Sequence, residues 1–387
     1  MSHHPLAAAL GGCLSLATAL GIGRFVYTPI LPYMADGLDL SRADAGLIAS
    51  ANFLGYLAGA LLVSLGSLPG ERRTWLLGGL ALAAVSTAAM AAVQTMAMFL
   101  ALRFASGVAG AVVMVFASAM VMDRLAIAGR PSLAAVLYAG VGTGIAISAL
   151  VAPLLATAGD DWEPLWLAGG GIALLLAIPV AWLLPDTRPE DRAARHRGHG
   201  AVRRSTYWRW ILGYGLVGFG YVVTATFISD LMRASPSLRP AEAWVWLVVG
   251  VSAIPSVALW TWCGRRWSNR VAFAAASVCE AVGVAVSVLS ESIAMLLLAS
   301  ALLGGTVMGL TALGLIEMAR LAASDPRRVL AIMTVAFGLG QMVGPTLAGL
   351  LHDATGTYLI ASMITAGGLL VGAVATATAP AHPDPGP

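Results

Sequence analysis

The chain contains no lysine, and only 11% of its 387 residues are charged. Soluble domains carry roughly 25% charged residues. Without lysine there is no Walker A phosphate-binding loop, so an ATP-driven pump within this chain is not expected. The three cysteines, Cys13, Cys263 and Cys279, lie in or beside apolar runs without metal-like spacing. We therefore predict no disulfide framework, no metal site, no cofactor and no enzymatic activity.

What the chain has in abundance is apolar sequence, with 59% hydrophobic residues and a mean hydropathy of +0.84. An apolar run of roughly 17 to 25 residues marks a membrane-spanning helix. About twelve such runs predict an all-α integral membrane protein. The predicted spans are residues 6–33, 43–68, 74–94, 96–122, 131–156, 162–184, 206–232, 241–263, 269–290, 292–322, 328–352 and 357–379.

The one long polar segment divides these spans into two sets of six. We predict an N-terminal six-helix bundle at residues 1–184, a cytoplasmic linker at 185–205 and a C-terminal six-helix bundle at 206–387. Glycines recur in the two halves at a nearly constant offset of 196 to 198 residues, as in Gly107 and Gly304. Such a repeat predicts pseudo-symmetric halves with a substrate site at their interface.

Glycine pairs within single spans predict close helix packing, because small residues let backbones approach in lipid. Examples are Gly55 with Gly59, and Gly142 with Gly144. The contacts are either static or sliding surfaces between moving helices, and the sequence leaves both open.

The arginines predict the orientation in the membrane, because basic residues favour cytoplasmic loops. With the N-terminus inside, 17 of the 22 arginines fall in inside loops, and outside loops hold Arg42, Arg233 and Arg239. We expect a multi-pass protein of a bacterial inner membrane with both termini cytoplasmic and no cleaved signal peptide. Because the basic residues are scattered over short loops, we expect no nucleic-acid partner.

Arg24 lies in a stretch at residues 21–32, at the end of the first apolar run. A charge inside a membrane span costs about 3 kcal/mol or more, so it usually faces a cavity or a partner. Pro29 and Pro32 follow, where a helix bends or ends. Arg24 is therefore our first candidate for substrate contact, on a helix predicted to form a wall of the substrate site.

Three further ionisable residues, Arg103, Glu280 and Glu317, lie inside predicted spans and away from the ends of these spans, and such residues are functional by default. Arg103 and Glu317 are our candidates for proton coupling, because a carboxyl group buried in a membrane can exchange a proton near neutral pH. The structural alternatives are an arginine bonded to backbone carbonyls and a carboxylate paired with Arg320. For Glu280 we favour a structural or interfacial role.

Neutral polar residues lie in several of the same spans. Convergent hydroxyl and amide groups orient a ligand within a mostly apolar pocket. Hydrogen bonding between helices is the alternative for each of them. The candidates for substrate contact beside Arg24 are Tyr27, Thr28, Asn52, Tyr56, Tyr138, Tyr221, Thr224 and Gln341.

Motifs at residues 21–29, 52–60, 138–146, 218–227 and 338–345 together resemble the YbfB/YjiJ type of the major facilitator superfamily (MFS). The resemblance implies alternating access, with helices 1, 4, 7 and 10 lining a cavity and helices 3, 6, 9 and 12 outside. Arg103 matches the arginine of the superfamily's helix 4 motif, which is linked to proton coupling.

Two departures limit what the resemblance implies. The loop at residues 66–73 is shorter than the superfamily's loop motif and has Glu71 as its one acid, so gating ion pairs there do not carry over. The proline of the helix 5 antiporter motif is displaced to Pro153, so the direction of transport is not implied.

We therefore predict a proton-coupled secondary transporter of a small organic molecule, monomeric in the lipid bilayer. Arg24 and Arg103 on predicted cavity helices indicate a slight preference for an anionic or carboxylate-bearing substrate. Two alternatives remain open: a drug or metabolite exporter with broad, apolar selectivity, and a membrane receptor or scaffold that transports nothing.

Overall fold

The computed structural model describes residues 4–64, 69–155, 161–184, 204–234, 236–321 and 326–380. Within these ranges there is no strand, and 12 helical stretches are long and apolar enough to cross a membrane. Each of the predicted spans coincides with one of them, which confirms the all-α membrane fold. The linker predicted at residues 185–205 lies almost wholly outside the described residues, so the domain boundaries stay predictions.

The helical elements follow one another with short connections. They are α1 (Pro5–Leu16), η1 (Ala17–Ile22), α2 (Tyr27–Leu38), α3 (Arg42–Ser64), α4 (Arg72–Ala89), η2 (Met90–Ala92), α5 (Met96–Ile127), η3 (Pro131–Leu133), α6 (Ala134–Ser148), α7 (Val151–Leu155), α8 (Glu163–Ala177), α9 (Val180–Leu183), α10 (Arg204–Ala234), η4 (Arg239–Ala241), α11 (Glu242–Arg266), α12 (Asn269–Leu289), α13 (Ile293–Leu321), α14 (Pro326–Thr355) and α15 (Leu359–Ala377).

The first span is broken in its middle, where α1 and the π-helix η1 give way to α2. The amide of Gly23 donates to the carbonyl of Thr18 at 2.9 Å, five residues back, so the helix is locally widened. Pro29 has no N–H to donate to the carbonyl of Phe25 four residues earlier. The break therefore lies just before Pro29.

The predicted span, residues 6–33, stops short of the observed end at Leu38, and of the two expectations for Pro32, a bend or an end, the end is wrong. Helix α2 runs through Pro32 to Leu38, because a proline early in a helix removes few backbone hydrogen bonds. The prolines shift the break towards the N-terminus instead, into the four residues that follow η1.

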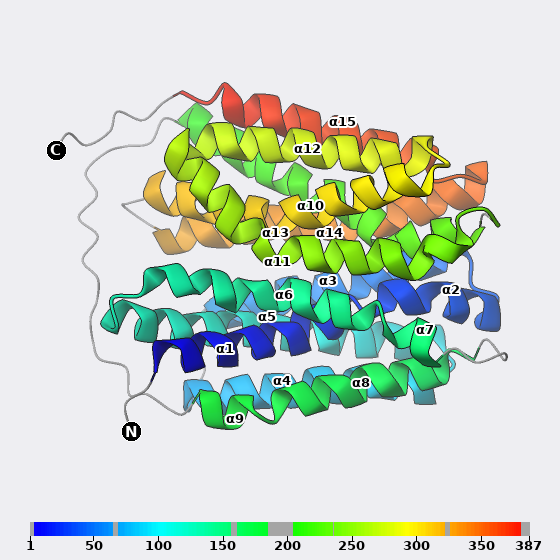
Figure 1. Ribbon diagram of the computed structural model, residues 1–387, viewed down its shortest axis with the longest axis horizontal. Helices are drawn as coiled ribbons and strands as arrows, with labels where there is room; N and C mark the ends of the chain where they lie inside the picture. Colours follow the sequence, from blue (N-terminus) through cyan, green and yellow to red (C-terminus); the bar gives the residue numbers. More distant parts are fainter. Residues whose placement is uncertain are drawn as a thin grey trace.

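The helices form two six-span bundles, α1 to α9 and α10 to α15 (Figure 1). Helices α4 and α8 lie along one edge of the molecule, and α12 and α15 along the opposite edge (Figure 1). These are the third, sixth, ninth and twelfth spans, so the outer position implied for them is confirmed.

Packing contacts repeat in the two bundles at the offset of the glycine repeat. A Cβ on Gly107 would collide with the carbonyl of Asn52, and a Cβ on Gly304 with the carbonyl of Val249. Both members of the second pair lie 197 residues after their counterparts. The recurring glycines therefore make equivalent close approaches between α3 and α5 and between α11 and α13.

Arginine contacts at the helix ends repeat as well. Arg73 donates to the carbonyl of Ala181 at 3.0 Å, and Arg270 donates to the carbonyl of Ala379. A cation near the last carbonyls of a helix is stabilising, because these groups carry partial negative charge. Each arginine thus ties its loop to the end of the neighbouring outer helix, α9 or α15.

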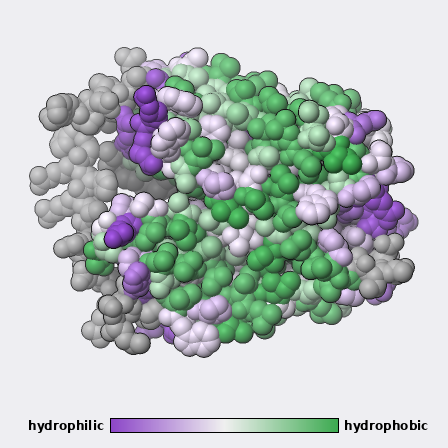
Figure 2. Space-filling model, viewed as in Figure 1, coloured by the Kyte–Doolittle hydropathy of each residue, from purple (hydrophilic) through white to green (hydrophobic). Residues whose placement is uncertain are grey.

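The surface carries a wide hydrophobic band between two hydrophilic ends (Figure 2). Large apolar side chains face outward on it, including Leu154, Leu175 and Val374. Such a band is too large for a water-exposed surface and fits a lipid environment.

Candidate functional site

A cavity of about 470 Å³ separates the two bundles at one end of the molecule. It opens at the end where α1 begins and α15 finishes, which we call the terminal end (Figure 1). Helices α5 and α6 line it from one bundle and α11 and α13 from the other, so the fourth and tenth spans line it as expected, and the fifth and eighth spans take the places expected for the first and seventh. The lining residues are Met114, Met122, Pro131, Ser132, Ala134, Ala135, Tyr138, Val257, Ala258, Thr261, Arg265, Met308, Thr311, Ala312, Leu315 and Ile316.

At the opposite end, which we call the far end, a buried ion pair joins the bundles. Arg42 Nη2 of α3 lies 2.9 Å from Asp230 Oδ1 of α10, and Asp230 is 3% exposed. The Tyr358 hydroxyl donates to the other oxygen of Asp230 at 2.6 Å. Burial and the adjacent Asp230 carboxylate raise the pKa of Tyr358 well above its usual range, so this hydroxyl stays a donor.

Asp353, at the end of α14, completes this far-end cluster of Arg42, Asp230, Asp353 and Tyr358. Its carboxylate accepts from the backbone amides of Arg42 and Ala43 at 3.0 and 2.8 Å. The first amides of a helix lack partners within it and favour an anion, so Asp353 caps α3 from the other bundle.

Two further contacts close the far end along α2 and α10. Arg233 lies 3.6 Å from Asp36 and stacks over the Tyr33 ring at 3.8 Å. Thr28 donates to the carbonyl of Ala225 at 2.7 Å. Thr28 and Ala225 are 197 residues apart, which is the offset of the glycine repeat, so they occupy equivalent positions in the two bundles. Their contact places the pseudo-twofold axis between them.

Glycines also separate into two roles at the junction of the bundles. Gly55 and Gly144 pack inside one bundle, against α5 and against η1 respectively. Gly142 instead faces Gly250 and Ile254 across the junction, and Gly338 faces Leu57. The first group packs within one bundle and the second packs between the two bundles, so the sliding interpretation stays a prediction for the second group.

Arg24 lies at the break in the first span, near the middle of the molecule. Its guanidinium stacks over the Tyr56 ring at 4.2 Å and over the Phe53 ring at 5.0 Å. The residue is only 8% exposed. Within the described part of the chain, its Nε and Nη2 are buried and have no hydrogen-bond partner.

Four tyrosines and one glutamine form a chain of interactions that begins at this arginine. The hydroxyls of Tyr56 and Tyr221 interact electrostatically with Arg24, and Tyr138 and Tyr214 with Tyr56. Gln341 donates from Nε2 to the Tyr221 hydroxyl. We call Arg24, Tyr56, Tyr138, Tyr214, Tyr221 and Gln341 the central polar cluster; both bundles contribute to it, and Tyr138 joins it to the cavity.

Arg103 makes the contacts of the structural alternative. Its Nη1 and Nη2 donate to the carbonyls of Gly23 and Arg24, each at 2.9 Å. Ser106 also donates to the carbonyl of Gly23, at 3.0 Å. The break in the first span leaves these two carbonyls without helical partners, so Arg103 holds the backbone that carries Arg24. A role in proton coupling stays a prediction.

Three predicted candidates form bonds away from the central polar cluster. Tyr27 donates to the carbonyl of Ala45 at 2.8 Å, and Asn52 donates to the carbonyl of Arg103 at 3.0 Å. Thr28 belongs to the closed far end, as described above. These contacts are the interhelical hydrogen bonds of the alternative interpretation.

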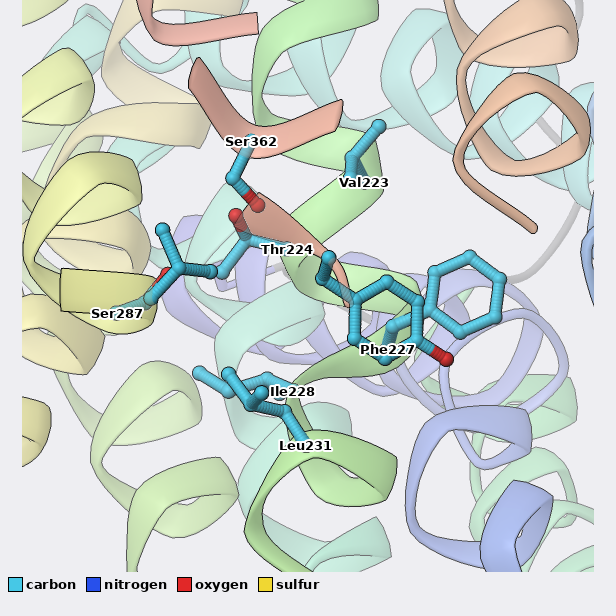
Figure 3. Close-up of a pocket in the computed structure, with 9 residues that line it drawn as sticks. Val223, Thr224, Phe227, Ile228, Leu231, Ser287 and Ser362 are labelled. Carbon is cyan, nitrogen blue, oxygen red and sulfur yellow. The ribbon is translucent and has the colours of Figure 1, made fainter. Parts of the chain in front are cut away.

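Thr224 faces a small pocket inside the second bundle. The pocket has room for about one water molecule, with a volume of about 10 Å³, and lies between α10, α12 and α15. Figure 3 shows the hydroxyl groups of Thr224, Ser287 and Ser362 around it. Thr224 therefore does not lie with the other predicted substrate-contact residues.

The two membrane glutamates differ in their surroundings. Glu317 is partly exposed near the end of α13 and accepts from Asn269 Nδ2 at 2.9 Å. Glu280 is 0% exposed between α12 and α13, where Thr306 donates to its Oε2 at 3.1 Å. Its Oε1 has no partner among the described residues.

Sequence reasoning missed Tyr214 and the far-end cluster of Arg42, Asp230, Asp353 and Tyr358. Tyr214 lies seven residues before Tyr221, a spacing that places both on one helix face. That spacing is a signal the sequence offers. The far-end residues lie in separate loops and helix ends, so their proximity has no signal in a single sequence.

No group of three or more His, Cys, Asp or Glu side chains in the described ranges could hold a metal ion.

A family profile described as "Uncharacterised MFS-type transporter YbfB" matches residues 16–377 of the chain. The chain is 31% identical to the "Uncharacterized transporter YgaY" of Escherichia coli O157:H7 over 194 residues, which are 49% of this chain and 48% of that protein. It is 29% identical to the "Uncharacterized MFS-type transporter YceJ" of Bacillus subtilis (strain 168) over 188 residues, 47% of this chain and 46% of that protein. The matched region thus spans about half the length of these relatives.

Solved structures share the fold over almost the whole chain. The nucleoside transporter NupG superposes with a TM-score of 0.74 at 14% identity, covering 96% of this chain and 98% of that one. A bacterial homologue of the human lysosomal transporter Spinster, in an inward-facing and unoccupied conformation, gives a TM-score of 0.71 at 14% identity, covering 98% of each chain.

Proposed function

The chain belongs to the family of the MFS-type transporter YbfB, and we propose that it moves a small organic solute across a bacterial inner membrane by alternating access, driven by protons. The observation that carries the proposal is the contrast between the two ends. A cavity separates the bundles at the terminal end, and buried polar contacts join them at the far end. At the break in the first span, Arg24 has two buried nitrogens without hydrogen-bond partners among the described residues.

The terminal end faces the cytoplasm in this proposal, as the arginine distribution predicts. The conformation then corresponds to an inward-open transporter, in keeping with the similar inward-facing Spinster homologue. Release of the far-end contacts and closure of the cavity would complete the cycle. The glycines Gly142 and Gly338 support this motion, because they leave no side chain at the junction of the bundles.

The preference for an anion rests on the charges available to a solute. Arg24 has no acidic partner among the described residues, and Arg265 lines the cavity together with no Asp or Glu. An electropositive route attracts anions and raises their local concentration. The methionines of the lining, Met114, Met122 and Met308, support the second candidate, a broad exporter, because their flexible side chains adapt to different ligands.

Purified protein in vesicles tests transport and its driving force together. A panel of small organic acids, amides and amines is screened for uptake above protein-free vesicles. For the fastest solute, we expect an imposed pH gradient to change the initial rate several-fold, and a sodium gradient of equal size to leave it unchanged. Flux that responds to sodium alone would contradict proton coupling, and absence of flux for every solute would favour the receptor or scaffold alternative.

Two glutamate variants then assign the coupling group. We expect Glu317→Gln or Glu280→Gln to transport without responding to the pH gradient, because an amide cannot exchange a proton. Both acids can be replaced without a change in side-chain size, so folding is little affected. If both variants keep the wild-type response, neither acid is the coupling group.

We expect Asp230→Asn to loosen the far end. The Arg42 guanidinium loses its charged partner, at a cost of about 1–3 kcal/mol, and the closed far end loses population by about tenfold or more. Hydrogen exchange should then rise at the backbone amides of residues 36–46 and 225–233. Asp123→Asn is the matched control, because Asp123 forms an exposed ion pair with Arg72 at 2.8 Å within one bundle. Equal exchange in the two variants would contradict a gating role for Asp230.

A further inference from the structure

We infer, building on the proposed function, that the substrate is a monocarboxylate with an apolar body, whose carboxylate binds the Nε–Nη2 edge of Arg24. The two nitrogens on that edge are the ones without partners. Adjacent guanidinium nitrogens donate two parallel hydrogen bonds and match the two oxygens of a carboxylate. An empty, buried fork of this kind is costly for the protein unless a ligand fills it.

The surroundings of Arg24 can neutralise one negative charge on a bound solute. Arg103 is the nearby second cation, and its Nη1 and Nη2 are already bonded to the carbonyls of Gly23 and Arg24. The Nε of Arg103 is its one buried nitrogen without a partner among the described residues, so a second carboxylate would find no two-point fork there and would be desolvated at a large cost. A cationic solute would meet Arg24 and Arg265 and no carboxylate, since the described cavity lining holds none.

Neutral groups of the second bundle complete the carboxylate site. Tyr221 accepts from Gln341, which leaves its own O–H proton free to donate to an anion beside Arg24. Gln341 is 0% exposed and is fixed by this contact. A carboxylate at Arg24 would thus contact both bundles, which is the position from which a ligand can favour one conformation over another.

The apolar body of the solute fits the cavity at the terminal end. Aliphatic and methionine side chains dominate the lining, and Tyr138 is its link to the central polar cluster. Tyr56 stacks on the face of the Arg24 guanidinium, which leaves the Nε–Nη2 edge for the carboxylate.

Thermal stability of the purified full-length protein tests this inference with paired probes. The probes are phenylacetate and 3-phenylpropionate, their primary amides, the dianion glutarate and the cation phenethylammonium. We expect the two acids to raise the melting temperature, and the amides, glutarate and phenethylammonium to bind at least tenfold more weakly. Equal responses to acids and amides, or no response to any probe by the folded wild type, would overturn the inference.

Three arginine variants locate the contact. Arg24→Gln should abolish the difference between acid and amide, and Arg24→Lys should bind the acids at least tenfold more weakly, because lysine keeps the charge and loses the two-point fork. Arg130→Gln removes one exposed arginine from a loop and changes the net charge equally, so it should bind like the wild type. Retained acid selectivity in Arg24→Gln would overturn the assignment.

Flux of the same probes separates this inference from the proposed function. Vesicles that move an amide or phenethylammonium in preference to the acids would overturn the substrate class and leave transport intact. Acid binding without flux of any probe would overturn the proposed function and leave the binding site intact.

Discussion

We expect Arg24→Ala to insert and fold, and to transport no solute above the level of protein-free vesicles. The wild-type guanidinium is buried with two unpartnered nitrogens and no acidic partner among the described residues. Each charge-assisted hydrogen bond to a ligand is worth about 1.5–3 kcal/mol. Loss of two such bonds weakens binding by about a hundredfold or more.

Folding should survive the same change, because it removes an unpaired buried charge rather than a satisfied one. The lost contacts are the stacking on Tyr56 and Phe53, each worth about 0.5–2 kcal/mol. Gel filtration and melting temperature check the fold, and initial uptake rates check the function. Arg130→Ala is the control, since it removes an exposed arginine at equal change in charge. Wild-type uptake by a folded Arg24→Ala would disprove the assignment of Arg24 to the substrate site.

We expect Gly304→Val to prevent folding, and Gly305→Val to be tolerated. A Cβ on Gly304 would collide with the backbone of Val249 on α11, whereas a Cβ on Gly305 would meet no atom within 4 Å. Backbone cannot rotate away as a side chain can, so the helices must separate. Overpacking of this kind costs about 3 kcal/mol or more, a large part of a typical stability of about 5–15 kcal/mol.

The two neighbouring positions form a matched pair, because both lie in the same turn of α13 and receive the same residue. The helix propensity cost of valine, about 0.5 kcal/mol, is therefore shared by both variants. The yield of monodisperse protein in detergent and its melting temperature measure the difference. Gly107→Val should behave like Gly304→Val, because Gly107 makes the equivalent contact in the first bundle. Equal yields of the 304 and 305 variants would contradict the packing role.

Arg24 and Arg103 illustrate the limit of sequence reasoning. Both are arginines within apolar spans, and the resemblance placed both on cavity helices. The break in the first span separates their roles. It frees the two backbone carbonyls that Arg103 binds. It also places the Arg24 side chain against Tyr56. Hydropathy predicts the span but not the break within it, because a π-helical break hardly changes the hydropathy of the segment.

The neutral polar residues show the same limit. Tyr56 and Tyr221 interact with Arg24, Tyr138 with Tyr56 and Gln341 with Tyr221, and their roles in substrate contact stay predictions. Thr224 stands one turn from Tyr221 and yet faces a pocket within its own bundle. A residue's span is set by local sequence, whereas the face it presents depends on how the neighbouring helices are rotated and tilted.

By itself the sequence determined the membrane environment, the number and position of the spans and the repeat that relates the two bundles. These properties follow from local composition and from spacing along the chain, because each span must be apolar over the thickness of the bilayer. The tertiary structure alone decided which end is closed, which arginine binds backbone carbonyls and which keeps two buried nitrogens without partners. Those outcomes depend on contacts between residues far apart in sequence, such as Arg42 with Asp230 and Arg103 with Gly23.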